Sequence, residues 1–218
     1  MSRETENIER LMEQKSVEFR DFKLTAIEAR KKDDGTEELV VEGVPCVFNS
    51  ETVLYKGKYY ECREIIDTNA FSGCDMSDVI FNYNHGGRVY ARTRNNSLQL
   101  SVGNDGLHMK ATLMNNDEGH AELYRDIQSG LIDKMSFAFH VDKSEYRYIE
   151  DGDREIEIRT VTAIDKLYDV SAVDIPAYDA TSISARNAFD AEREKRKAES
   201  LKRAKDIALL KLKLGGIE

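Results

Sequence analysis

The sequence predicts a mainly β fold with helices, an α+β domain whose antiparallel strands form a closed or partly open barrel flanked by helices. Three observations predict it. Short runs of β-branched and aromatic residues alternate with turn formers between Phe22 and Pro176. Within this region, residues 117–130 have the pattern of a helix. From Ala188 onward, helix formers predominate and predict a separate charged helix.

The composition divides the chain into three parts: a charged arm at 1–17, a β-barrel domain at 18–187 and a charged helical tail at 188–218. A chain of 218 residues suffices for one well-buried domain with terminal extensions. Charged residues, 33% of the total, gather toward both ends. The core is therefore expected in the middle part.

Strands are expected where apolar runs lie between turn formers. The turn-like segments KKDDGT and Lys56-Gly57 each join a hairpin-like pair, and DTNAFSG at 67–73 predicts a short helix capped by Asp67 or Thr68. The predicted strand segments are 22–29, 37–49, 52–66, 77–84, 89–93, 97–102, 106–114, 131–141, 145–150, 155–164 and 166–176.

The segment 117–130 has an acidic start, apolar positions that include Leu123 and Ile127, and a closing Gly130, which together predict an amphipathic helix. In the strand that follows, Ser136 alternates in period two with bulky apolar residues. Ser136 is therefore expected on a strand among bulky neighbours.

Composition and motifs exclude several classes of protein. A net charge of -9 repels phosphate backbones, so no nucleic-acid partner is expected. No apolar stretch approaches the about 20 residues of a spanning helix, and the charged start is unlike a signal peptide, so we expect a cytoplasmic protein without a membrane partner.

Cys46, Cys62 and Cys74 show no CxxC spacing and are expected to be reduced thiols. G-x-S-x-G, HExxH, P-loop and GxGxxG motifs are absent, and no cofactor or metal is expected.

One of the four histidines, His85, lies in a polar turn directly after a predicted strand, where Gly86 and Gly87 follow it. An imidazole titrates near neutral pH and can take a proton from a hydroxyl, so His85 is the candidate base. A surface turn histidine is the alternative. Ser136 is likewise either a small polar strand residue or a nucleophile, because a serine hydroxyl is reactive only beside a base and an oxyanion site.

Seven segments, taken in order, resemble motifs of the prohead protease family of tailed phages. They are VEGVPCVFN, DTNAF, NYNHGG, ART, LQLSVGNDGLHMKATL, GLIDKMSFAF and LYDVSAVDIPAY. The similarity runs from about Val41 to Arg186, and seven motifs in register make it specific. The resemblance implies a fold like that of the herpesvirus assembly proteases. It also implies a serine endopeptidase that cleaves scaffold or capsid precursor segments, and itself, inside the assembling procapsid in the host cytoplasm.

The resemblance also implies the catalytic residues. His85 matches the histidine of the family's NHD motif, and Ser136 matches the serine of its GMSFGF motif. Asp169 matches the acidic residue of its EVSPV motif, where a carboxylate fixes the imidazole tautomer. Asp165 and Asp174 lie nearby and remain alternatives for this third position.

The chain departs from the family pattern at three positions. Gly86 replaces the Asp that follows the histidine, and Lys134 and Ala138 replace the two glycines of GMSFGF. None of these changes removes a proposed catalytic side chain. Lys134 either faces solvent or favours an oxyanion. Arg92, in the segment ART, and backbone amides near Ser136 are the candidates for oxyanion stabilisation.

The sequence also allows two alternatives to a serine endopeptidase. The first is a non-catalytic scaffold or assembly protein that uses the barrel for binding, as the charged tail after Ala188 suggests. The second is a cysteine protease that uses Cys74 with His85. The expected partner is a capsid precursor or scaffold protein as substrate, and the resemblance to herpesvirus proteases implies a homodimer.

Overall fold

The computed structural model describes residues 17–22, 27–31, 39–174 and 178–214. The predicted arm at 1–17 and the turn KKDDGT therefore lie almost entirely outside the described residues. The chain splits into two compact units, 1–184 and 185–218. All strands belong to the first unit, and the second contains most of helix α3 (Tyr178–Leu214).

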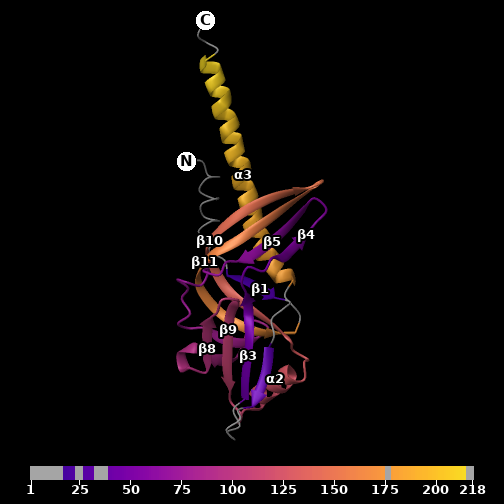
Figure 1. Cartoon of the computed structure of the whole chain (residues 1–218), viewed down its shortest axis with the longest axis vertical. Helices are drawn as coiled ribbons and strands as arrows, with labels where there is room; N and C mark the ends of the chain where they lie inside the picture. The colour runs from indigo at the N-terminus through magenta and orange to yellow at the C-terminus, as the bar shows by residue number, and fades with distance from the viewer. Residues whose placement is uncertain (1–16, 23–26, 32–38, 175–177, 215–218) are drawn as a thin grey trace. The chain divides into compact units, whose positions relative to one another are not determined.

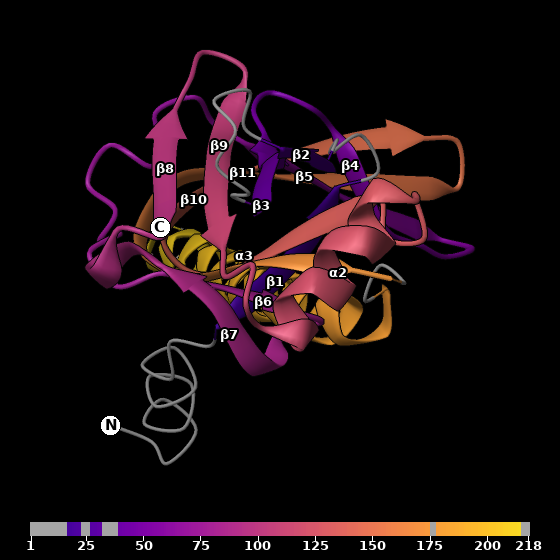
Figure 2. The same ribbon diagram turned by 90° about the horizontal axis from the view of Figure 1, so that it is seen from below.

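The first unit contains two β-sheets (Figure 1). The main path of the seven-stranded sheet is β1 (Glu18–Phe22), β10 (Lys134–Asp151), β11 (Arg154–Val173), β5 (Tyr60–Ile66) and β4 (Thr52–Lys56). Its other two strands are β6 (Ile80–Tyr83), which pairs with β11, and β7 (Gly86–Arg92), which pairs with β6. The four-stranded sheet, part of which is seen in Figure 2, has the order β2 (Ile27–Lys31), β3 (Leu39–Val47), β9 (Gly106–Leu113) and β8 (Leu98–Val102).

The predicted mainly β, α+β class is confirmed, but the strands form two separate sheets that are not closed into a barrel. The reason lies in β11, a strand of 20 residues with room for two partners along one edge. Strand β5 pairs with its first part and β6 with its last part, and both pairs are parallel. Parallel neighbours need crossover connections, which local turn signals do not reveal.

Strands β10 and β11 are longer than the short strands expected from the sequence. They form a continuous antiparallel hairpin, seen in Figure 1 as two long curved strands. Irregularities in register between Ala138 and Ser144 bend the pair without ending it. Asp142 and Lys143, which interrupt the apolar pattern, therefore lie within a strand and not in a loop.

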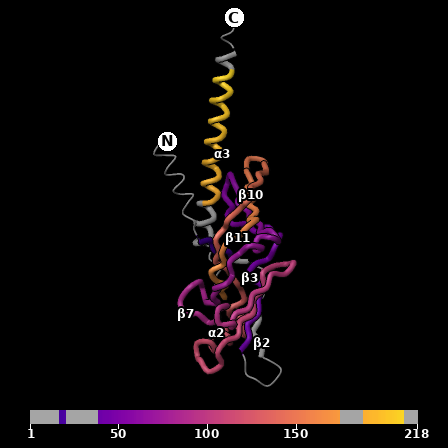
Figure 3. Tube along the Cα trace, turned by 90° about the vertical axis from the view of Figure 1, so that its left-hand side faces the viewer, coloured from indigo at the N-terminus to yellow at the C-terminus, as the bar shows by residue number. Residues whose placement is uncertain are grey.

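The hydrophobic core contains residues of both sheets and of helix α2 (Glu118–Gln128). Val41 and Leu107 of the four-stranded sheet, Phe137 and Leu167 of the seven-stranded sheet, and Leu123 of α2 are all buried in it. Helix α2 lies beside β2 and β3 (Figure 3). Met135 and Phe137 lie in this core, and Ser136 between them points to the opposite face of β10, where it is also buried.

The predicted helix at 117–130 is confirmed. Asp117 caps α2 by accepting a hydrogen bond from the backbone N–H of His120, and Gly130 follows the helix with a φ of 76°. Residues 68–73, in contrast, form consecutive turns and no helix, and Asp67 Oδ1 accepts a hydrogen bond from Asn69 N. None of the helices in the described part of the chain is long and apolar enough to cross a membrane.

Candidate active site

His85 lies in the two-residue turn of the β6–β7 hairpin. Asn84 and His85 have φ values of 51° and 54°, and Tyr83 pairs with Gly86 across the turn. Two consecutive positive φ angles match the twist of a tight hairpin, and Asn and His adopt them more readily than most residues. The turn is therefore two positions earlier than the Gly86-Gly87 turn that the sequence suggested. Asn84 N donates to Ala172 O at 3.0 Å, which ties the turn to β11.

Ser136 lies in a row of paired residues that runs across the seven-stranded sheet. Ser136 of β10 pairs with Ser171 of β11, which pairs with Asn82 of β6. On the other side, Ser136 pairs with Asp21 of β1. This row places the end of β6, and so the turn that contains His85, close to Ser136.

The His85 imidazole bridges Ser136 and Asp169. Its Nε2 is 2.6 Å from Ser136 Oγ, and its Nδ1 is 2.8 Å from Asp169 Oδ1. Asp169 lies two residues before Ser171 on β11, so both side chains lie on the same face of the strand. The Phe19 ring meets the imidazole edge-on, with centroids 4.7 Å apart. The three residues implied by the resemblance thus form one hydrogen-bonded series.

The other two carboxylates considered for the third position have different partners. Asp165 Oδ1 is 2.5 Å from Nδ1 of His140, and Asp174 Oδ2 accepts a hydrogen bond from the Tyr83 hydroxyl at 2.8 Å. The geometry therefore favours Asp169 over both of them.

Ser171 and Asn82 belong to the site although the sequence did not single them out. Ser171 Oγ is 2.9 Å from Asp169 Oδ1 and 3.1 Å from His85 Nδ1, and it also contacts Asn82 Oδ1. Both residues are buried. The signal in the sequence was the period-two pair of Asp169 and Ser171, which places two polar side chains together on one face of the strand segment LYDVSAV.

The two cations considered near the nucleophile are paired with neighbouring carboxylates. Lys134 Nζ is 2.9 Å from Asp133 Oδ1. The Arg92 guanidinium binds both oxygens of Asp78, at 2.5 and 2.7 Å. Bidentate pairing holds a guanidinium in a defined place, so these contacts favour a structural role for Arg92.

Cys74 is poorly suited to be a nucleophile. Burial, together with the negative charges of Asp165 and Asp75, raises the pKa of its thiol to about 12. The thiol is therefore protonated at neutral pH, whereas a nucleophilic cysteine needs a lowered pKa. The described residues include no group of three His, Cys, Asp or Glu side chains placed to hold a metal ion.

Strand β1 covers the nucleophile candidate. It pairs antiparallel with β10, and the backbone carbonyl of Arg20 accepts a hydrogen bond from Ser136 Oγ at 2.9 Å. Ser136 has no exposed surface.

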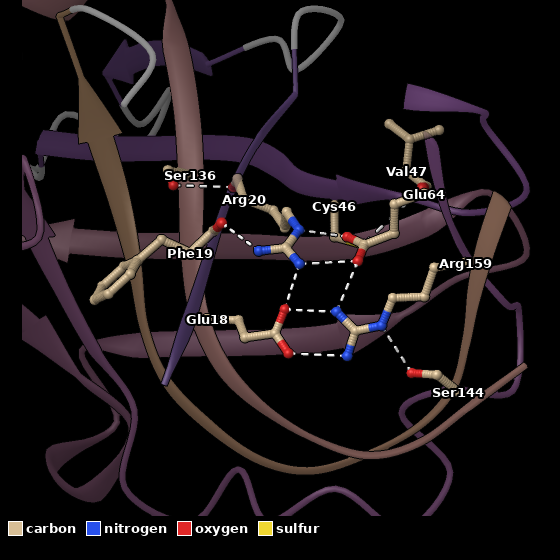
Figure 4. A network of polar contacts seen from close by, with 9 residues as sticks. All are labelled: Glu18, Phe19, Arg20, Cys46, Val47, Glu64, Ser136, Ser144 and Arg159. Carbon is tan, nitrogen blue, oxygen red and sulfur yellow. Dashed lines mark hydrogen bonds and ion pairs between the residues drawn. The ribbon is translucent and has the colours of Figure 1, made fainter. Parts of the chain in front are cut away.

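A closed ring of four charged side chains lies beside this contact (Figure 4). Arg20 binds Glu18 and Glu64, and Arg159 binds the same two carboxylates, with nitrogen-to-oxygen distances from Arg159 Nη1 of 2.7 Å to Glu18 and 3.1 Å to Glu64. All four side chains are buried. Burial alone would raise the pKa of the Glu18 carboxyl, but the charges of Arg20 and Arg159 and their hydrogen bonds outweigh it and lower the pKa from 4.5 to about 2.

Acid is expected to destabilise the domain through Glu18. Its folded-state pKa of about 2 lies below its ordinary value of 4.5, so its stabilisation is complete above pH 4.5 and is lost as the pH falls through about 2. The lowered pKa corresponds to about 3 kcal/mol in the free energy of unfolding. Urea unfolding at pH 7, 4.5, 3 and 2 measures how much of this free energy is lost. The variant Glu18→Gln should lose less stability over this range, and an equal loss in both proteins would contradict the assignment.

A serine hydroxyl, an imidazole and a carboxylate in one hydrogen-bonded series form the arrangement of serine hydrolases. Comparison with known families narrows this class. The sequence profile of the caudovirus prohead serine proteases matches residues 25–196. The chain therefore belongs to this family and is a serine protease of phage prohead maturation.

Among solved structures, the chain is similar to the bacteriophage T4 capsid assembly protease. The two are 14% identical, the match covers 74% of this chain and 99% of the T4 chain, and the TM-score is 0.37. A comparison with curated proteins found no match.

Proposed function

We propose that Ser136, His85 and Asp169 are the catalytic triad of an endopeptidase that cleaves capsid precursor or scaffold segments inside the assembling procapsid. The single observation that carries the assignment is the pair of contacts made by His85, 2.6 Å to Ser136 Oγ and 2.8 Å to Asp169 Oδ1. Family membership supplies the class of substrate. The chain itself is a second substrate, and the host cytoplasm is the compartment in which the procapsid assembles.

The proposed chemistry is acyl transfer. Ser136 Oγ attacks the carbonyl carbon of the scissile peptide while its proton passes to His85 Nε2. His85 then gives this proton to the leaving amine, and the C–N bond breaks. Water, deprotonated by the same imidazole, hydrolyses the acyl ester and restores the Ser136 hydroxyl. Asp169 accepts the hydrogen bond from Nδ1–H and stabilises the imidazolium. Ser171, which also contacts Asn82, positions Asp169.

Co-expression with the capsid precursor of the same phage tests the assignment. The chain is expected to cleave the precursor, and Ser136→Ala to leave it at full length. Ser101→Ala, at an exposed serine on β8, is the matched control and should cleave normally. Circular dichroism checks that each variant folds. Continued cleavage by folded Ser136→Ala would refute the triad.

The same experiment tests the alternative of a non-catalytic assembly protein, which predicts an uncleaved precursor with every variant. The implied homodimer and the likeness to herpesvirus assembly proteases remain predictions. The division of the chain into a charged arm, a protease domain and a helical tail at 188–218 also remains a prediction.

A further inference from the structure

A protease must let a peptide carbonyl approach its nucleophile to about 3 to 3.5 Å. Ser136 is fully buried although its contacts with His85 are formed. Strand β1 occupies the place beside it, at the edge of the seven-stranded sheet. An extended peptide that adds a strand to a sheet edge is a recurring way to bind a substrate. Strand β1 therefore holds the edge position at which an added peptide strand would pair with β10.

The contact between β1 and Ser136 has the form of a bound but unreactive peptide. The carbonyl oxygen of Arg20, not its carbon, faces Ser136 Oγ at 2.9 Å. The hydroxyl has one proton and two acceptors in reach, this carbonyl and His85 Nε2. When the proton goes to the carbonyl, the base cannot take it. Strand β1 thus both covers the hydroxyl and competes for its proton.

The residues of β1 lie outside the part of the chain that matches the family. The match begins at residue 25, and β1 ends at Phe22. The charged partners of β1 lie within the match, because Glu64 is on β5 and Arg159 is on β11. The ring of four charges therefore joins a strand outside the matched residues to a pair within them.

Glu64 and Arg159 remain compensated when β1 leaves. Arg159 Nη1 contacts Glu64 Oε2 at 3.1 Å independently of β1. A buried charge without a partner is costly, and a pair that compensates itself avoids this cost while its other contacts change. The pair can therefore release one strand and accept another with a matching acidic and basic residue.

We propose that β1 is an internal occupant of the substrate site, and that Glu64 and Arg159 select substrate strands with an acidic and a basic residue two positions apart, in the order of Glu18 and Arg20. The proposal rests on the proposed function, since it takes Ser136 as the nucleophile. The backbone carbonyl presented to Ser136 is that of the basic residue, so cleavage is expected after it, by the acyl transfer described above.

The first test releases β1 in the full chain. A fluorophosphonate probe forms a phosphonate ester with Ser136 and releases fluoride, and mass spectrometry locates the adduct. Glu18→Gln with Arg20→Gln is expected to raise the labelling rate at least tenfold. The matched control is Glu118→Gln with Arg125→Gln, which removes an exposed ion pair on α2 and should leave the rate unchanged.

Equal labelling rates in the wild type and in a folded Glu18→Gln, Arg20→Gln variant would overturn the proposal. So would an absence of labelling in both, when a commercial serine protease is labelled in parallel. If the labelling results overturn the proposal about β1, cleavage of the capsid precursor by the wild type but not by Ser136→Ala would still support the proposed function.

The second test measures selectivity in the Glu18→Gln, Arg20→Gln background. A fluorogenic decapeptide that contains Glu-Phe-Arg-Asp is expected to be cleaved after Arg with a kcat/KM at least ten times that of a peptide with Arg-Phe-Glu-Asp. Exchanging the two charges in the site, Glu64→Arg with Arg159→Glu, should reverse this preference. Equal cleavage of the two peptides by the unexchanged protein would overturn the assigned selectivity, whether or not the exchanged variant folds.

Discussion

An Asp169→Asn variant is expected to cleave the capsid precursor about 10⁴ times more slowly than the wild type. The amide keeps the shape of the carboxylate but can donate a hydrogen bond to His85 Nδ1, which favours the tautomer with its proton on Nε2. That nitrogen is 2.6 Å from Ser136 Oγ and must accept its proton. Timed samples of purified precursor, separated by gel electrophoresis, measure the rate.

Two neighbouring aspartates are the controls for Asp169. Asp165→Asn and Asp174→Asn alter carboxylates that contact His140 and Tyr83, and both variants should stay within about a factor of ten of the wild type. A loss of 10³-fold or more in one of them, with Asp169→Asn near wild-type rates, would move the third position of the triad to that residue.

Arg159→Met is expected to lower the free energy of unfolding by about 3 to 5 kcal/mol. The substitution removes the guanidinium that binds both Glu18 and Glu64 and leaves Arg20 alone between two buried carboxylates. Methionine fills much of the volume, so the loss reports the missing charge and its hydrogen bonds. Urea unfolding at pH 7 measures it.

Arg125→Met is the control for Arg159→Met. Arg125 pairs with Glu118 on the surface of α2, with both side chains largely exposed, and its removal should leave the free energy of unfolding nearly unchanged. Similar losses in the two variants would mean that the buried ring contributes no more than a surface ion pair.

Local features of the fold could be predicted from the sequence, and strand pairing could not. Helix α2 was predicted because its cap, its apolar stripe and Gly130 are neighbours in sequence. The parallel pairing of β11 with β5 and β6 was missed because it depends on crossovers between segments about a hundred residues apart. The same limit produced the expectation of a closed or partly open barrel, since a strand pattern does not reveal where a sheet ends.

The candidate site was predictable only in part. From the residues alone, His85 and Ser136 were ambiguous, and the family resemblance singled them out with Asp169. Ser171 was missed because a serine on a strand usually has no special role, and its contacts with Asp169 and Asn82 depend on the strand register. The sequence could not predict that strand β1 covers Ser136, because Arg20 lies 116 positions away from Ser136 in the sequence.

The order of the strands along the chain also sets the order in which the site can form during synthesis. His85, Ser136 and Asp169 come together through the pairing of β6, β10 and β11, which needs the chain as far as residue 173. Contacts of such long range form slowly, because distant segments must first meet. Strand β1 leaves the ribosome before any of the three. A nascent chain therefore has no assembled triad, and the strand that covers the nucleophile is already present when β10 and β11 first pair.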